Sequence, residues 1–189
     1  MSSTTGGYFP RRSSGGIDAG ESLTWPMALL LLLLGVGSVV LPAILRSPLK
    51  LPGHQGLVSM ALLMSGRTLS RYRWAASVSS VGAGMTALLP LWGSDDPILW
   101  LTYLVPGLVI DVGLLFAGRW REQMWFLALL AGLAYGTKPL LRLAAGAIFG
   151  WPYGSLLSGV LYPLVLHILF GAIGGLIGVG VVRLSGRRS

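Results

Sequence analysis

Residues 131–151 read AGLAYGTKPLLRLAAGAIFGW, and this stretch decides how the rest of the chain is interpreted. Most of it is apolar, yet Lys138 and Arg142 lie inside it and Pro139 follows the lysine. A cation at membrane depth is costly, so it usually faces a protein interior, a water-filled cavity or the interface. Tyr135, Lys138 and Arg142 are spaced i, i+3 and i+7, which predicts that they share one helix face.

The composition around this stretch predicts an integral membrane protein. Of the 189 residues, 53% are hydrophobic and 11% are charged, whereas soluble domains carry about 25% charged residues. The 28 glycines suit helices that pack closely in lipid. The chain has no cysteine, which excludes disulfides, thiolate chemistry and cysteine-ligated metals.

Apolar segments predict an all-α membrane protein with six transmembrane helices. The expected spans are residues 25–45, 55–69, 74–92, 98–118, 123–151 and 155–184. The second is short for a span, so a tilted, partly buried or interfacial helix is an alternative. Residues 25–185 are then one transmembrane domain, between a disordered cytoplasmic tail at 1–24 and a basic cytoplasmic tail at 186–189.

Basic residues fall mainly on one side of this topology. Two lie in loops on the other side, Arg46 and Lys50. Ten share the side of the termini: Arg11, Arg12, Arg67, Arg71, Arg73, Arg119, Arg121, Arg183, Arg187 and Arg188. Basic loops stay in the cytoplasm, so both termini are expected there, in a multi-pass protein of the cell membrane. The net charge of +8 therefore reflects topology, and a nucleic-acid partner is not expected.

Polar residues inside the spans give the candidate binding residues. From the helical rise, Asp111 is expected in the inner half of the membrane and His167 near its middle, which makes them a candidate pair. Each residue has a structural alternative. Arg142 and Lys138 reach toward the interface, Asp111 ties helices together, and His167 is a hydrogen-bonded interior residue.

Small residues mark possible helix contacts. Gly171 and Gly175 form a small-xxx-small pair in the last span, which predicts either packing inside the chain, the preferred reading, or docking to another membrane protein. Gly35, Gly37 and Ser38 in the first span are an alternative docking face.

Several catalytic signatures are absent from the sequence. There is no GxxxxGK[ST] motif, so no ATPase activity is expected of this chain. There is no HExxH motif, and the two histidines are far apart, so no metal site is expected. No convergent acid–base set is visible, and neither an enzyme nor a cofactor is expected.

The order of features resembles one family, the substrate-binding S components of energy-coupling factor (ECF) vitamin transporters. The matching pieces are LPGHQGLVSMALLMSGR at 51–67, YLVPGLVIDVGLLFAGRW at 103–120 and HILFGAIGGLIGVGVVRL at 167–184. The resemblance covers residues 25–185 and implies a subunit that binds a vitamin or vitamin precursor from outside. It also implies partners, a transmembrane coupling protein and two ATPase subunits that drive uptake. S components commonly dock through an AxxxA pattern in the first span, where this chain has Gly35, Gly37 and Ser38.

The leading hypothesis is therefore a substrate-binding subunit of an ATP-driven importer of a small polar vitamin. Its pocket would lie among the last three spans under loops 46–54 and 93–97. The expected substrate-binding residues are Tyr135, Lys138, Arg142, Trp151, Tyr153, His167 and Asp111, with His54 and Asp95 as gate contacts. The cations favour a carboxylate or phosphate, and the aromatic residues suit a flat ring.

Two other classes of function remain open. The first is a non-transporting membrane scaffold or assembly subunit, in which the glycine faces bind partners. The second is an enzyme acting on lipid, which has the least support.

Overall fold

The computed structural model describes residues 22–45, 51–89, 96–150, 153 and 159–186. This part of the chain contains helices and no strand. The α-helices are α1 Trp25–Leu45, α2 Gly56–Leu69, α3 Ala75–Ala87, α4 Leu99–Phe116, α5 Met124–Phe149 and α6 Leu161–Gly186. A short 3₁₀ helix, η2, covers Gly118–Trp120. The prediction of an all-α chain is confirmed for these residues, which form six α-helices.

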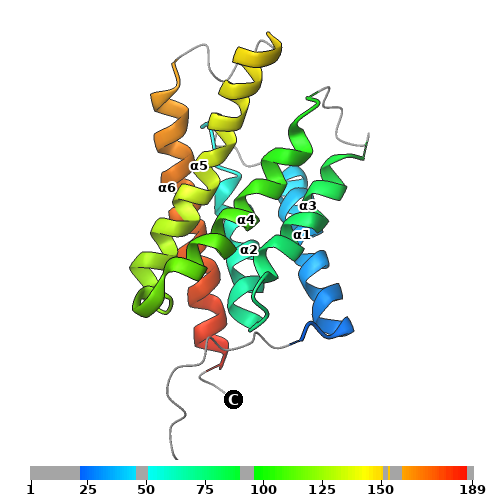
Figure 1. The fold of residues 1–189 in the computed structure, drawn as a ribbon, viewed down its shortest axis with the longest axis vertical. Helices are drawn as coiled ribbons and strands as arrows, with labels where there is room; N and C mark the ends of the chain where they lie inside the picture. Colours follow the sequence, from blue (N-terminus) through cyan, green and yellow to red (C-terminus); the bar gives the residue numbers. More distant parts are fainter. Residues whose placement is uncertain (1–21, 46–50, 90–95, 151–152, 154–158, 187–189) are drawn as a thin grey trace, which may run out of the picture.

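The helices form one bundle with two recognisable ends (Figure 1). Helix α6 packs between α5 and α2, and α3 packs between α1 and α4. The start of α1, the α2–α3 connection, η2 and the end of α6 lie together at the end that we call the basic end. The other end, which we call the opposite end, holds the end of α5 and the start of α6.

Four helices are long and apolar enough to cross a membrane, namely α1, α4, α5 and α6. This supports a membrane protein. Helix α2 is apolar but has 14 residues, and α3 has 13. At 1.5 Å per residue these helices are about 20 Å long, against a hydrocarbon core of about 30 Å.

Helix α3 is shorter than the predicted 74–92 span, since it ends at Ala87. The sequence offers a reason, because Pro90 disfavours helical geometry in the residue before it.

Glycines on α6 bring the neighbouring helices into backbone contact. A Cβ atom at Gly174 would lie 2.5 Å from the carbonyl oxygen of Gly56, and one at Gly178 would overlap that of Ala61. On its other side, Gly171 would meet the Cβ of Tyr135 at 2.6 Å. The glycines of the last span therefore pack inside the chain, against α2 and α5.

Candidate functional site

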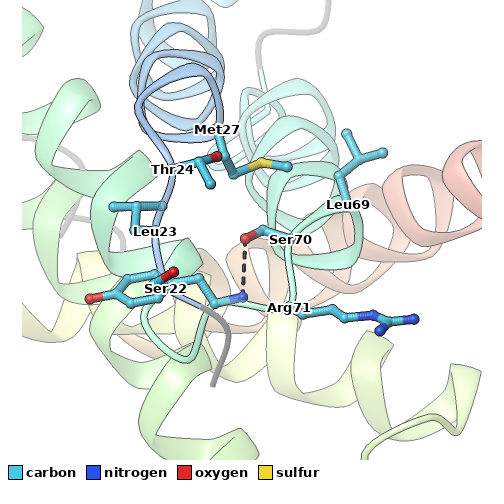
Figure 2. A pocket seen from close by; sticks show the side chains of 8 residues that line it. Ser22, Leu23, Thr24, Met27, Leu69, Ser70 and Arg71 are labelled. Carbon is cyan, nitrogen blue, oxygen red and sulfur yellow. Dashed lines mark hydrogen bonds between the residues drawn. The ribbon is translucent and has the colours of Figure 1, made fainter. Parts of the chain in front are cut away.

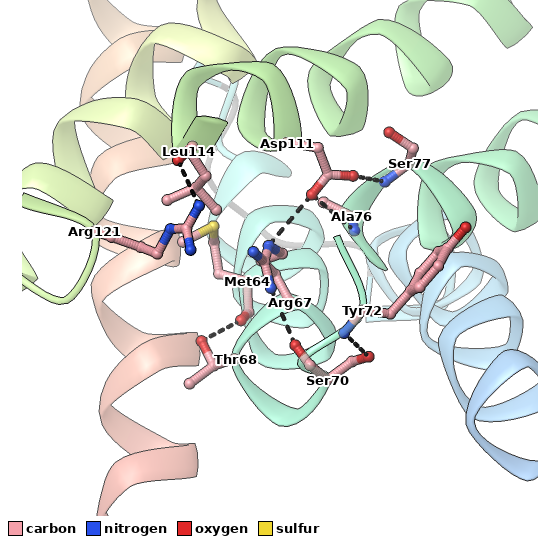
Figure 3. Close-up of polar contacts among 10 residues, drawn as sticks. All are labelled: Met64, Arg67, Thr68, Ser70, Tyr72, Ala76, Ser77, Asp111, Leu114 and Arg121. Atoms are coloured by element: carbon pink, nitrogen blue, oxygen red, sulfur yellow. Dashed lines mark hydrogen bonds and ion pairs between the residues drawn. The ribbon is translucent and has the colours of Figure 1, made fainter. Parts of the chain in front are cut away.

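Asp111 lies near the basic end and belongs to a buried polar cluster (Figure 3). Its Oδ1 atom is 3.3 Å from the Nε of Arg67. The carboxylate also accepts hydrogen bonds from the backbone N–H groups of Ala76, at 3.3 Å, and Ser77, at 2.7 Å. These N–H groups belong to the first turn of α3, which has no intrahelical partners for them, so Asp111 caps this helix.

This cluster corrects the predicted Asp111–His167 pair. The carboxylate of Asp111 is fully buried and is engaged by α2 and α3. His167 donates instead from Nδ1 to the carbonyl of Pro163, one turn earlier in α6, at 2.7 Å. The sequence interpretation missed Arg67 as the partner because it grouped this arginine with the basic residues on the cytoplasmic side. Asp111 thus ties α2, α3 and α4 together, which was its structural alternative.

Lys138 occupies a second and different environment. Its Nζ atom lies 3.5 Å from the ring centroid of Tyr103 on α4 and 4.7 Å from that of Tyr135 on its own helix. The residue is 8% exposed. Within the described residues, Nζ has neither a hydrogen-bond acceptor nor a carboxylate partner. Lys138 is therefore a buried cation that is held only by aromatic faces.

Helix α5 stays continuous across Pro139. Its polar face is therefore unbroken, and Lys138 on this face points to the interior. Pro139 lies within the continuous helix and is buried. Tyr135 and Lys138 are buried as well, and Arg142 follows one turn later with its side chain 30% exposed. The predicted face of Tyr135, Lys138 and Arg142 therefore runs from the interior of the bundle toward the opposite end.

Arg142 is held by an acidic residue that precedes α4. Its Nη2 atom is 3.4 Å from Oδ2 of Asp96, and the hydroxyl of Tyr153 donates to Oδ1 of the same carboxylate at 3.2 Å. The guanidinium lies 5.9 Å from the ring centroid of Tyr153. Desolvation, followed by the negative charge of Asp96, raises the pKa of Tyr153, so that its hydroxyl stays protonated and able to donate. Asp96 thus joins the start of α4 to α5 and to the α5–α6 connection.

His167 completes the aromatic side of the cluster. Its ring stacks on Tyr135, with the centroids 5.2 Å apart and an interplanar angle of 25°. Gly53 lies so close to this ring that a Cβ atom there would be 2.9 Å from Nδ1, and its φ of +80° also favours glycine. Because Nδ1 donates to Pro163, the neutral imidazole carries its lone pair on Nε2.

Tyr135 is not available for stacking on a ligand in this conformation. It is 2% exposed, and His167 covers its ring. A Cβ atom at Gly56 would lie 2.5 Å from the edge of the same ring. In this conformation the ring of Tyr135 is therefore not exposed for the predicted stacking on a ligand. It lies instead beside the Nζ atom of Lys138.

A small cavity adjoins Lys138. It has a volume of about 10 Å³, and its lining includes Tyr103, Tyr135 and, from α1 and α2, Ser38 and Ser59. A cavity of this size holds at most one water molecule. The described conformation is therefore closed, and a larger ligand needs side chains to move before it can reach the lysine.

A larger cavity, of about 210 Å³, lies at the basic end between the start of α1 and the end of α2 (Figure 2). Its lining includes hydroxyls from Ser22, Thr24 and Ser70, together with Leu23 and Arg71. Figure 2 shows the guanidinium of Arg71 extending away from the other lining residues. This cavity offers volume but no buried charge, so the Lys138 cluster is the better candidate site.

The remaining predicted residues lie elsewhere. Trp151 and Asp95 are outside the described residues. The Nδ1 atom of His54 lies 2.6 Å from the carbonyl oxygen of Leu51 in the turn before α2.

The predicted docking residues are largely buried inside the chain. Gly35 faces the backbone of Ser79 on α3, and Ser38 donates to the carbonyl of Gly35 at 2.6 Å. Gly171 and Gly175 are buried against α5. Gly37, near Leu62 of α2, is only partly buried. The burial of Gly171 and Gly175 agrees with the preferred prediction of packing inside the chain, and a docking face at Gly35, Gly37 and Ser38 stays a prediction.

Sequence reasoning missed two members of the site, Tyr103 and Asp96. Tyr103 meets Lys138 only because α4 packs against α5, and no spacing in the local sequence marks this contact. The sequence interpretation placed Asp96 in the 93–97 loop. It assigned the gate contact of this loop to the neighbouring Asp95. Nothing in the local sequence distinguishes these two carboxylates.

Comparisons with protein-family models, with curated proteins and with solved structures give no match to this chain.

Proposed function

We propose that the chain is the substrate-binding membrane subunit of an ATP-driven importer of a small polar molecule of the vitamin or vitamin-precursor class. One observation carries the proposal, namely the buried Lys138 without an anionic partner among the described residues. Dehydrating an ion costs several kcal/mol even after the protein has relaxed. A cation–π contact returns about 2 kcal/mol or more when it is desolvated. A bound ligand anion would offset the remaining free energy of dehydration.

The position of the cluster supports capture from outside. Arg71, Arg73 and Arg119 lie at the basic end, which the positive-inside rule assigns to the cytoplasm. Lys138 and Arg142 lie on the half of α5 that approaches the opposite end. A ligand would then enter from the external face and meet Arg142 before Lys138.

The partners follow from what the sequence lacks and from what it resembles. A chain without a phosphate-binding loop cannot couple ATP hydrolysis to uptake by itself. The resemblance to ECF S components supplies the missing parts, a transmembrane coupling protein and two ATPase subunits. The bundle described here is then the specificity component of a larger assembly.

The test is mass spectrometry of small molecules retained by the full-length protein after gentle purification in detergent. We expect one compound at near-stoichiometric amount in the wild-type protein and its loss in Lys138→Met. Arg119→Gln is a matched control, because Arg119 also lies against an aromatic ring, that of Trp120 at 4.7 Å, but at the basic end. Uptake of the identified compound by cells that express the chain with its partners would complete the assignment.

Two results would count against the proposal. The first is a wild-type protein that retains no compound and supports no uptake of any candidate. The second is retention that is equally strong in Lys138→Met and in wild type.

The scaffold alternative relies on glycine faces that bind partners and on buried charges that lock helices together. Gly35, Gly171 and Gly175 are buried within the chain, which weakens the first of these two supports.

A further inference from the structure

Two side-chain donors at the site lack hydrogen-bond acceptors among the described residues. Lys138 Nζ has only ring contacts within the described residues. The Nε of Arg142 is buried and has no hydrogen-bond partner, although the same guanidinium reaches Asp96 through Nη2. Buried polar groups are nearly always paired, so each unpaired donor needs an explanation. Here two of them come from one face of one helix.

The spacing of these donors suits a single small anion. Lys138 and Arg142 are four residues apart on α5, which places them about 6 Å apart along the helix axis. A carboxylate has two oxygens with about four acceptor positions and can receive both donors. Its bonds to the two cations would be charge-assisted and therefore stronger than neutral hydrogen bonds.

The charges of the described residues favour a ligand with one negative charge. Among the described residues of the cluster, Lys138 and Arg142 are positive and Asp96 is negative. The other titratable groups that face these cations are neutral in their ordinary states, namely Tyr103, Tyr135, Tyr153 and the His167 imidazole. One positive charge remains in excess, and a monoanion neutralises it.

We propose that this site selects small molecules with one carboxylate, which bridges Lys138 and Arg142, and that Asp96 competes with the ligand for Arg142. The inference rests on the proposed function and deepens it by naming the substrate class. Asp96 holds the guanidinium of Arg142 in the closed conformation, where the adjoining cavity has room for one water. An arriving carboxylate replaces Asp96 at this guanidinium and pairs with the lysine beneath it.

The experiment uses the full-length protein in detergent with three probes, benzoate, its neutral amide benzamide and the dianion phenyl phosphate. Binding is measured as a dissociation constant and as a shift in melting temperature. We expect benzoate to bind, benzamide not to bind, and phenyl phosphate to bind more weakly than benzoate. Lys138→Met should weaken benzoate binding by roughly tenfold or more, as expected for loss of a charged hydrogen bond.

Asp96→Asn separates competition from a merely structural role. Removing the competing charge should tighten benzoate binding by up to about fivefold, the range of a partly exposed ion pair. A supporting residue would instead weaken binding when it is changed. The control Arg119→Gln, at the basic end, should leave the benzoate dissociation constant unchanged.

Several outcomes would overturn the inference. They are equal binding of benzoate and benzamide, tighter binding of phenyl phosphate, no binding of benzoate, or unchanged or weaker benzoate binding in Asp96→Asn. If the compound retained by the purified protein is neutral or cationic, the proposed function stands and this substrate class falls. If no compound is retained and no uptake occurs while benzoate still binds as described, the importer assignment falls and the carboxylate site stands.

Discussion

At the scale of single residues, we expect the charged side chain of Lys138 to destabilise the ligand-free fold. Its dehydration costs several kcal/mol, and the rings of Tyr103 and Tyr135 return only part of this. Sites that bind ligands are often strained in this way, because the strain is relieved only when the ligand is present. The residue therefore predicts opposite effects on folding and on binding.

We expect Lys138→Met to raise the melting temperature of the ligand-free protein by about 2–8 °C, from a gain on the order of 1–2 kcal/mol. Methionine fills the same space without a charge to dehydrate. Thermal unfolding in detergent measures the change. Leu140→Met, at a 45% exposed position on the same helix, is the control and should alter stability by less than about 0.5 kcal/mol. A melting temperature that falls in Lys138→Met would show that the lysine stabilises the fold.

The sequence predicted the residues of this site better than their partners. The shared face of Tyr135, Lys138 and Arg142 follows from helical spacing alone, and the structure confirms it. The contacts with Tyr103 and Asp96 depend on how α4 lies against α5, which no local pattern encodes. Depth along a helix also misled the pairing of Asp111, because two groups at one depth need not face each other.

At the scale of elements, α3 depends on a carboxylate from another helix. Its first turn has no capping side chain of its own, and Asp111 on α4 supplies the acceptor. The ion pair with Arg67 compensates the charge of this buried carboxylate. Three helices thus share one polar cluster.

Asp111→Ala should lower the free energy of unfolding by about 3–5 kcal/mol, because it leaves Arg67 buried without its anion. Adding Arg67→Met to the same protein should recover part of this loss, with a coupling energy of about 0.5–3 kcal/mol. Denaturant unfolding of the two single variants and the double variant gives the cycle. Val112→Ala, at the exposed neighbouring position on α4, should cost much less. Strictly additive effects would show that the two residues do not interact.

The close packing of the α6 glycines against neighbouring helices leads to a second prediction at this scale. Gly178→Ala should destabilise the protein by about 1–3 kcal/mol, since its Cβ atom would overlap the carbonyl of Ala61 on α2. Gly180→Ala is the matched control, because no atom lies within 4 Å of a Cβ atom there. It should be neutral or stabilising by up to about 1 kcal/mol. Equal effects of the two substitutions in thermal unfolding would rule out close packing as the reason for Gly178.

At the scale of the whole molecule, the distribution of charge predicts its orientation. Cysteine substitutions at Pro97, near the opposite end, and at Ser185, at the basic end, test this in a chain with no native cysteine. Both positions are exposed. A membrane-impermeant maleimide should label Pro97→Cys in intact cells and should label Ser185→Cys only after permeabilisation. The reverse pattern would place the Lys138 site on the cytoplasmic side and contradict capture from outside.

The number of helices was predictable because polar or basic loops separate the helical segments of the sequence. Their lengths were less so, and α3 is the clearest case. Its apolar sequence continues beyond Ala87, but the helix ends there. Composition alone does not show where along an apolar stretch a helix stops.

The shortness of α2 and α3 has a consequence for the surrounding lipid. Beside α1, which has 21 residues, α3 presents exposed Val81 and Met85 from a helix of only 13. A bilayer that meets this flank must thin locally, at a cost of a fraction of a kcal/mol for each ångström of hydrophobic mismatch. Membranes of short-chain lipids would relieve that deformation, so we expect the stability of this protein to depend on the acyl chain length of the host membrane.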